Sequence, residues 1–107
     1  MKPIYLGEFE QLVLLALMRL GDGAYGMTVR REIADRTGRE VTIGAVYVTL
    51  DRMERKALVR SRLGEPTEVR GGRAKRCFTI TAPGLAALEL SQKALKRMTD
   101  GLKLRHV

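Results

Sequence analysis

Apolar side chains recur every three or four positions through much of the chain, a spacing that predicts amphipathic helices. In the first such segment, residues 8–20, the apolar positions are Phe9, Leu12, Val13, Ala16, Leu17 and Leu20. The second segment, about residues 25–37, carries Val29 and Ile33 on the side expected to face inward. A glycine follows each segment, and glycine readily adopts the left-handed backbone at which helices end. The first part of the chain therefore predicts two helices joined by a short turn.

A third helical segment, about residues 43–57, follows Thr42, a residue type whose hydroxyl caps helix N-termini. Its apolar stripe consists of Val46, Leu50, Met53 and Ala57. At ~100° per residue, the opposite side carries small, apolar and basic residues. These residues are Gly44, Val48, Arg52 and Arg55, flanked by Ala45, Tyr47 and Asp51. We expect the apolar stripe to face the core, so the opposite side is the candidate functional surface.

Two segments with strand-like alternation follow the third helix. Residues 59–63 alternate apolar or small with basic side chains, and residues 75–81 carry Phe78 and Ile80 at alternate, inward-facing positions. The connection between them, residues 64–74, is longer than the ~2–5 residues of a tight hairpin loop. It is also rich in arginine and glycine. The pattern predicts an antiparallel β-hairpin with a long basic loop.

The last segment, about residues 82–103, predicts a fourth helix. Thr81 is a plausible cap, and Pro83 occupies the early helical position in which proline is tolerated. Its apolar residues recur at coiled-coil-like spacing, interrupted by polar ones. We expect no core of the same chain to remain for them to cover, so a partner chain is the natural place to bury them. The candidate dimerisation residues are Leu85, Leu88, Leu95, Met98 and Leu102.

The order of these elements predicts a mainly α fold with a small β-hairpin, a winged helix-turn-helix followed by a C-terminal dimerisation helix. Residues 1–81 would form a winged helix-turn-helix DNA-binding domain, and residues 82–107 the dimerisation helix, continuous with the same domain. In this arrangement the segment 43–57 is the recognition helix, and residues 64–76 form the basic wing. A chain of 107 residues is long enough for one such domain.

The positive charge of the chain is concentrated in its second half. Twenty Lys and Arg residues against twelve Asp and Glu give a net charge of +8. Residues 1–40 have no net charge, whereas residues 41–81 carry +5 and residues 82–107 carry +3. A clustered basic excess attracts polyanions through release of their counterions. The excess begins where the predicted recognition helix begins, as a DNA-binding surface would have it. A merely soluble basic surface is the alternative, and charge alone does not separate the two.

The exposed side of the predicted recognition helix suits contact with a DNA groove. Gly44 and Ala45 allow close approach, and the helix N-terminus favours a phosphate. Tyr47 can donate its hydroxyl to a phosphate oxygen, and Val48 can touch a thymine methyl group. Packing beside the second helix is an equally good interpretation of Tyr47 taken alone.

Cations complete the candidate DNA-binding surface. On the recognition helix they are Arg52 and Arg55, suited to phosphate or guanine contacts. In the wing they are Arg70, Arg73, Lys75 and Arg76. Each has a structural alternative, because the helix arginines can pair with Asp51 or nearby glutamates and the wing can be a solubilising loop. The two groups support each other because their order matches one docking geometry.

The sequence contains no set of residues that could bind a metal or a cofactor or carry out catalysis. His106 is the only histidine and Cys77 the only cysteine, too few for a zinc site or a catalytic triad. We therefore expect no enzyme, no cofactor and no metal. With one cysteine no intramolecular disulfide can form, and the apolar run 12–17 is too short to span a bilayer, so we expect a cytoplasmic protein. Cys77 is either a redox sensor or a packing residue, and its place beside Phe78 favours packing.

Several motifs together resemble the PadR family of bacterial winged-helix repressors. They are Leu6-Gly7-Glu8-Phe9-Glu10, Ala24-Tyr25-Gly26, Gly44-Ala45-Val46-Tyr47, Leu50-Asp51-Arg52-Met53-Glu54, Arg70-Gly71-Gly72-Arg73 and Phe78-Thr79-Ile80-Thr81-Ala82-Pro83-Gly84. The resemblance covers nearly the whole chain. It implies a homodimer that binds double-stranded operator DNA and is released by a small molecule or another signal. The single C-terminal helix is similar to that of the compact subgroup, in which this helix and the first one build the dimer.

The same resemblance implies roles for individual residues. Tyr47 would contact the phosphate backbone of the DNA, and Tyr25 would stand at the start of the helix that supports the recognition helix. With Thr42 they complete the candidate DNA-binding set. Three departures stand out: Ala57 replaces a usual glycine, Val48 replaces a common polar residue, and the chain has no tryptophan with which to stack flat drugs as some compact relatives do.

Two other classes of function fit the same residues. One is a protein-interaction or ligand-sensing module that keeps the winged-helix fold without binding DNA. The other is a nucleic-acid-binding protein without sequence preference that uses the same basic face. Neither the operator, the regulated genes, the effector nor the sign of regulation follows from the sequence.

Overall fold

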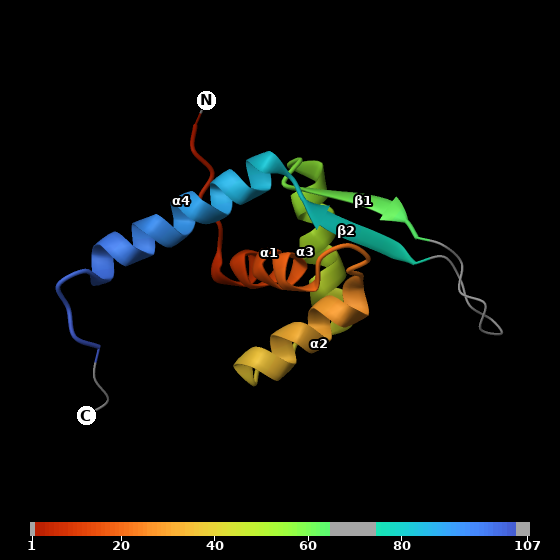
Figure 1. The fold of residues 1–107 in the computed structure, drawn as a ribbon, viewed down its shortest axis with the longest axis horizontal. Coiled ribbons are helices and arrows are strands. Elements are labelled where there is room, and N and C mark those ends of the chain that lie inside the picture. The colour runs from red at the N-terminus through yellow and green to blue at the C-terminus, as the bar shows by residue number, and fades with distance from the viewer. Residues whose placement is uncertain (1, 65–74, 105–107) are drawn as a thin grey trace.

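The computed structural model describes residues 2–64 and 75–104. Its elements in chain order are α1 (Glu8–Leu20), α2 (Gly26–Thr37), α3 (Ile43–Arg55), β1 (Val59–Leu63), β2 (Arg76–Ile80) and α4 (Ala82–Thr99). The three helices α1 to α3 pack together, the β1–β2 hairpin extends from one side of them, and α4 extends from the other (Figure 1). The predicted fold class, mainly α with a small hairpin, is confirmed.

The predicted bounds hold to within one residue for α1, α2 and both strands. Two helices end earlier than predicted. Helix α3 ends at Arg55 rather than at residue 57, and α4 ends at Thr99 rather than at residue 103. Beyond α4 the backbone leaves the helical region, and Gly101 has a left-handed φ of 82°. The apolar pattern continued past both helix ends and could not locate them.

Just past the end of helix α3, Ala57 has a left-handed φ of 61°. The Ala57 N–H donates to the Glu54 carbonyl at 2.9 Å, and the Leu58 N–H donates to the Met53 carbonyl at 2.9 Å. This pair of bonds is the Schellman motif, in which the left-handed residue is usually glycine. Leu58 and Met53 are fully buried, whereas Ala57 is exposed. The prediction that Ala57 lies on the core stripe is therefore wrong, because the helix ends before it.

The hydrophobic core lies among α1, α2 and α3 and is closed by β2. Its completely buried side chains come from all these elements and from the turn before β1. They are Val13, Leu14, Val29, Val46, Leu50, Met53, Leu58 and Phe78. These include Val29 and the inward positions predicted for helix three, apart from Ala57. The other inward position predicted for helix two, Ile33, is also buried, at 3% exposed. Burial of such side chains is the main contribution to folding.

The hairpin is attached to the helices along β2. The strands pair antiparallel with Val59 opposite Ile80, and Cys77 also forms a bridge to Tyr25 on its other edge. The Phe78 N–H donates to the Ala24 carbonyl at 2.8 Å. The strand β2 thus lies between β1 and the turn that precedes α2, which fixes the base of the hairpin beside α2.

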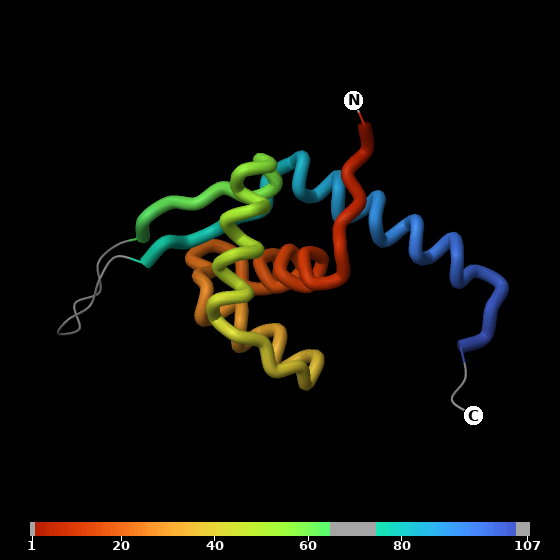
Figure 2. The backbone as a smooth tube through the Cα atoms, turned by 180° about the vertical axis from the view of Figure 1, so that it is seen from behind, coloured from red at the N-terminus to blue at the C-terminus, as the bar shows by residue number. Residues whose placement is uncertain are grey.

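The first half of α4 packs on α1 and on the N-terminal segment. Ser91, which is buried, accepts a hydrogen bond from the Leu6 N–H at 2.9 Å and donates to the Ala87 carbonyl at 2.8 Å. Leu88 is only 4% exposed within the chain's own core. The expectation that the whole leucine stripe covers a partner chain is therefore wrong for Leu88. The second half of α4 projects away from the helices (Figure 2).

Within residues 2–64 and 75–104, no helix is both long and apolar enough to cross a membrane.

Candidate nucleic-acid interface

The N-terminal half of α3 presents a bare outer surface. Thr42 caps the helix as predicted, because its Oγ1 accepts a hydrogen bond from the Ala45 N–H at 3.1 Å. Gly44 and Ala45 are exposed, and Val48 is 61% exposed although it is apolar. Small side chains near the start of the helix leave its backbone open to close approach from outside, as a helix entering a DNA groove requires.

Tyr47 lies between this surface and α2. Its ring packs over the backbone of Gly26, where an added Cβ would lie 2.4 Å from the Tyr47 Cζ atom. The side chain still remains 37% exposed. The packing interpretation and the contact interpretation of Tyr47 are therefore compatible, since the ring rests on α2 while part of it reaches solvent. Glycine at position 26 is what allows this arrangement.

Arg52 is engaged with the first turn of α1. Its Nε atom lies 3.4 Å from Oε2 of Glu10, and the Lys56 Nζ atom lies 4.0 Å from the same oxygen. The other Glu10 oxygen accepts the Gly7 N–H at 2.9 Å, so Glu10 caps α1 and holds α3 at once. Arg52 is therefore less available to DNA than its place on the helix predicts. Arg55 is exposed and has no ion pair among the described residues.

Arg76 is bound to α3, although its side chain stays partly exposed to solvent. Its Nη1 atom donates to Asp51 Oδ1 at 2.8 Å, its Nη2 atom donates to Glu54, and its Nε atom donates to Ser61 Oγ at 3.2 Å. The guanidinium carbon lies 4.9 Å from the centroid of the Phe78 ring. The prediction that Arg76 reaches an adjacent groove or phosphates stays a prediction, and in this structure two carboxylates of the recognition helix hold the guanidinium.

Glu54 is the centre of this cluster. It accepts hydrogen bonds from the Ser61 N–H at 3.1 Å and from the Ser61 hydroxyl, and it pairs with Arg76. The Ser61 hydroxyl lowers the pKa of Glu54 most, and the Arg76 charge lowers it further against the opposing effect of partial burial. Glu54 therefore stays ionised at neutral pH and keeps its acceptor oxygens.

Lys75 and Tyr25 come together at the edge of the hairpin. The Lys75 Nζ atom lies 4.1 Å from the centroid of the Tyr25 ring, within the range of a cation–π contact. Tyr25 precedes α2, and its N–H donates to Thr28 Oγ1 at 3.0 Å. Both were predicted as separate DNA-binding residues, and the fold makes them neighbours. Arg70 and Arg73, the other predicted wing cations, lie outside the described residues.

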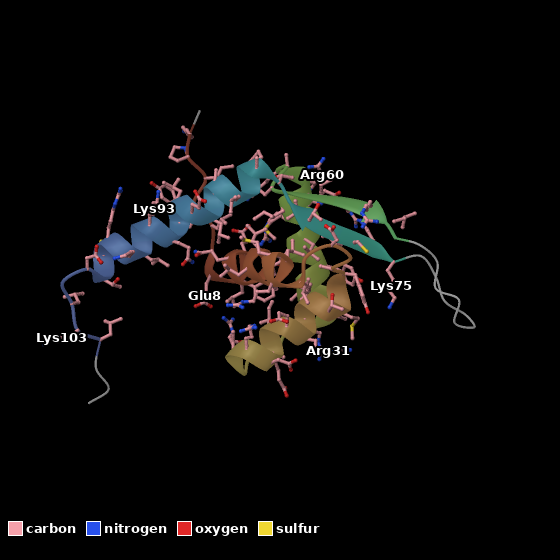
Figure 3. The ribbon with its side chains drawn as sticks, in the orientation of Figure 1. Glu8, Arg31, Arg60, Lys75, Lys93 and Lys103 are labelled. Carbon is pink, nitrogen blue, oxygen red and sulfur yellow. The ribbon has the colours of Figure 1, made fainter. Side chains whose placement is uncertain are left out.

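Two cations of β1 were not among the predicted contacts. Arg60 and Arg62 are exposed and have no ion pair among the described residues. Alternate side chains of a strand point to opposite faces. Since Ser61 faces α3, the two arginines lie on the outer face of the hairpin; Figure 3 labels Arg60 on β1 and Lys75 beside β2. The alternation of basic residues along 59–63 was the available signal.

A separate apolar surface lies between α1 and α4, away from the recognition helix. A groove of about 470 Å³ is lined there by Leu12, Leu15 and Leu95 together with polar groups of Gln11 and Gln92. Further along, past the body of the domain, Met98 and Leu102 are 77% and 65% exposed. Among the described residues no group of three or more His, Cys, Asp or Glu side chains could hold a metal ion.

The chain is similar to known regulators over most of its length. The PadR-like family of transcriptional regulators matches residues 14–90. A PadR family transcription regulator from Clostridium difficile R20291 has a TM-score of 0.72 at 24% identity, covering 88% of this chain and 96% of that one. A PadR-like transcription factor from Bacteroides fragilis has a TM-score of 0.73 at 20% identity, covering 86% and 84%.

A third similar structure is F93, a winged-helix DNA-binding protein from STIV, with a TM-score of 0.70 at 18% identity and coverage of 92% and 99%. No curated protein sequence matches the chain. At these identities the solved structures establish the winged-helix fold alone. The match of residues 14–90 to one family is the finding that establishes relationship.

Proposed function

Because the chain belongs to the PadR-like family of transcriptional regulators, we propose that it is a homodimeric repressor that binds operator DNA and is released by a small molecule or another signal. The observation that carries this proposal is the bare N-terminal half of α3, where Gly44, Ala45 and Val48 are exposed beside a basic hairpin. Val48 is apolar yet 61% exposed, on a helix that otherwise packs against the core. Contact with a thymine methyl group would explain this exposure.

The start of α3 enters the major groove in this proposal. Its free N–H groups and positive end attract a phosphate, and the exposed part of Tyr47 donates to the backbone. Tyr25 and Lys75 form a single contact point at the hairpin edge. Arg55 contacts phosphates directly, whereas Arg52 shares its charge with Glu10 and contributes less. Base contacts of this kind discriminate by about 1–3 kcal/mol each.

Dimerisation buries the outer half of α4. Leu95 and Met98 are exposed on a helix that leaves the domain body, and Leu102 is exposed just beyond the end of that helix, which is costly for a monomer in water. The Cα radius of gyration is 15.7 Å, against roughly 13 Å expected for a compact chain of this length. A second copy packed against Leu85 and the groove between α1 and α4 covers these residues. Two recognition helices related by a twofold axis then read two half-sites.

The groove between α1 and α4 is also where an effector fits. Its volume of about 470 Å³ suits a small organic molecule, and its lining combines leucines with amide groups. Without tryptophan in the chain, stacking of flat drugs between indole rings is not part of this proposal. A regulator of this kind acts in the bacterial cytoplasm, where its DNA is.

A second candidate function is a nucleic-acid-binding protein without sequence preference. The exposed Arg60 and Arg62 on the outer face of the hairpin favour it, because cations away from the recognition helix add affinity for any duplex. The two candidates differ in how binding depends on sequence, so one titration separates them.

Fluorescence anisotropy on the DNA upstream of the protein's own gene tests the proposal, with a scrambled duplex as the comparison and both titrated across salt. We expect tight binding to the native duplex that keeps its preference as salt weakens it. Equal and steeply salt-dependent binding to both duplexes supports the second candidate or an operator elsewhere. No binding to either duplex supports a protein-interaction module.

Matched variants connect the binding to α3. Ala45→Glu puts a carboxylate on the proposed DNA surface, in the first turn of a helix where glutamate is well tolerated. Ala86→Glu makes the same change at an exposed position of α4. We expect the first variant alone to lose DNA binding. Sedimentation at micromolar concentration tests the dimer, and a monomer there would end the paired half-site model.

A further inference from the structure

We propose that Arg76, Asp51 and Glu54 form a strut that sets the angle of the β-hairpin against the recognition helix, and that DNA affinity depends on this angle. The inference rests on the proposed function, since it assigns positioning residues to that DNA interface. It concerns side chains that do not themselves touch DNA, two of which carry the wrong charge to do so.

The contacts join elements that are distant in sequence. Asp51 and Glu54 are three residues apart on α3 and therefore lie on one side of the helix. Arg76 begins β2, and its guanidinium bonds to both carboxylates, with 2.8 Å between Nη1 and Asp51 Oδ1. A planar guanidinium with donors in fixed directions can hold two carboxylates at a set angle, which a lysine ammonium cannot do.

The other strand is attached to the same cluster. Ser61 of β1 donates its N–H to Glu54 at 3.1 Å, and its Oγ accepts from Arg76 Nε at 3.2 Å. Glu54 therefore holds a residue from each strand. Each hydrogen bond in the cluster joins two different elements, so the hairpin cannot rotate about α3 without breaking several charge-assisted hydrogen bonds at once.

The strut lies at the outer part of the hairpin. Arg76 is paired with Leu63, the last residue of β1, whereas the buried anchor Phe78 lies nearer the base. On the opposite edge of β2, Cys77 bridges to Tyr25 at the start of α2. The outer hairpin is thus held from two sides, by α2 through the bridge and by α3 through the strut. Loss of the strut leaves one of these two supports.

The strut is exposed, so its loss should not unfold the domain. The side chains of Arg76, Asp51 and Glu54 are 41%, 43% and 31% exposed, and surface ion pairs contribute little to stability. The hydrophobic core is complete without them. A role in stability alone therefore predicts little effect of substitution, and a role in positioning predicts an effect on DNA binding.

Electrostatics and positioning predict opposite results for Glu54→Gln. Removing a carboxylate from the recognition helix makes the DNA surface more positive, so charge alone predicts tighter binding. Loss of the strut predicts weaker binding. The triple variant Asp51→Asn, Glu54→Gln, Arg76→Gln sharpens the contrast, because it also gains one net positive charge while removing every ion pair of the cluster. Glu40→Gln is the matched control, an exposed carboxylate just before α3 with no ion pair among the described residues.

The experiment uses two duplexes containing the operator, one ending at the recognition-helix site and one extended beneath the hairpin. For Glu54→Gln and for the triple variant we expect affinity for the long duplex to fall about tenfold, the size of a typical coupling between contacting residues. Affinity for the short duplex and thermal stability should stay near those of the wild type. Glu40→Gln should bind both duplexes as well as or better than the wild type. Equal or tighter binding of the triple variant to the long duplex would overturn the strut.

A measurement without DNA separates this inference from the proposed function. Spin labels at Val48→Cys on α3 and Arg62→Cys on β1, in a Cys77→Ser background, report the distance distribution between helix and hairpin. We expect a narrow distribution that broadens with Glu54→Gln. An unchanged width would overturn the strut even if the wild type binds its operator. A broadened width in a protein that binds no specific DNA would leave the strut standing and remove the proposed function instead.

Discussion

Replacing Ala57 with glycine should stabilise the protein, although the change removes a side chain. Ala57 has a φ of 61°, where a Cβ atom is crowded by the neighbouring carbonyl. That crowding costs roughly 1–2 kcal/mol, and the greater freedom of glycine in the unfolded chain returns about 0.5–1 kcal/mol of it. Ala57 is exposed, so no buried surface is lost. The net expectation is a gain of about 0.5–1 kcal/mol in the free energy of unfolding.

Urea and thermal unfolding measure this gain at one fixed protein concentration, because any dimerisation makes stability concentration-dependent. For a domain of this size the expected rise in Tm is about 2–6 °C. The two Schellman hydrogen bonds use only backbone atoms, so they survive the substitution. Contacts made by the N-terminal half of α3 should be unchanged, since Ala57 lies beyond the other end of that helix.

Ala86→Gly is the matched control, since Ala86 is exposed within α4 and has an ordinary helical backbone. There the same chemical change should destabilise by about 1 kcal/mol. A rise in the free energy of unfolding for Ala57→Gly together with a fall for Ala86→Gly would indicate strain from the left-handed backbone at Ala57. A glycine at position 57 that is neutral or destabilising would refute the reasoning, because it would mean that the residue does not occupy the left-handed region.

Three further predictions concern close contacts and charge. Gly84→Ala should destabilise by about 2–3 kcal/mol, because its Cβ would lie 2.0 Å from the Leu58 carbonyl oxygen, and urea unfolding measures this. Gly26→Ala should displace the Tyr47 ring at a cost of only about 1 kcal/mol in stability. It should weaken operator binding about tenfold, which corresponds to the loss of one hydrogen bond to a charged group. Anisotropy and thermal melting together measure both effects, and unchanged affinity would mean that Tyr47 does not contact DNA. The lowered pKa of Glu54 stabilises the fold above its ordinary value of 4.5 and ceases to do so as pH falls through the folded pKa. Because the cluster is partly exposed, the stability advantage of wild type over Glu54→Gln should be small. It should be present at neutral pH and vanish in acid, as urea unfolding across pH measures, and a constant difference across pH would contradict it.

Periodicity predicted the helices well because the core decides where apolar residues stand. Val46, Leu50 and Met53 are fully buried at the predicted positions, and Thr42 caps α3. Periodicity could not predict where a helix stops when the next residue is also apolar. Ala57 continues the stripe in sequence but occupies a left-handed conformation that only the backbone hydrogen bonds reveal.

The candidate site was harder to predict because it depends on contacts between distant segments. No local pattern indicates that Arg52 meets Glu10, 42 positions away, or that Lys75 lies over Tyr25. The leucine stripe likewise could not reveal that Leu88 packs inside the chain while Leu95 stays exposed, since both have the same spacing. The types of side chain in the sequence indicated the candidate DNA-binding and dimerisation residues, and the tertiary structure shows which of these residues are free of contacts within the chain.

The charges show most clearly that DNA binding depends on how many cations are free to contact DNA rather than on the total number of cations. The segment from the recognition helix to the end of the hairpin carries a net +5, from which alone one would expect strong attraction to any polyanion. Several of its cations are already held by carboxylates, as Arg76 is by two residues of α3 and Arg52 is by α1. A cation that is paired with a carboxylate can neutralise a phosphate only if that ion pair breaks. The salt dependence of operator binding should therefore reflect the unpaired cations alone, and Arg55→Gln should reduce its slope by about one where Arg76→Gln should not.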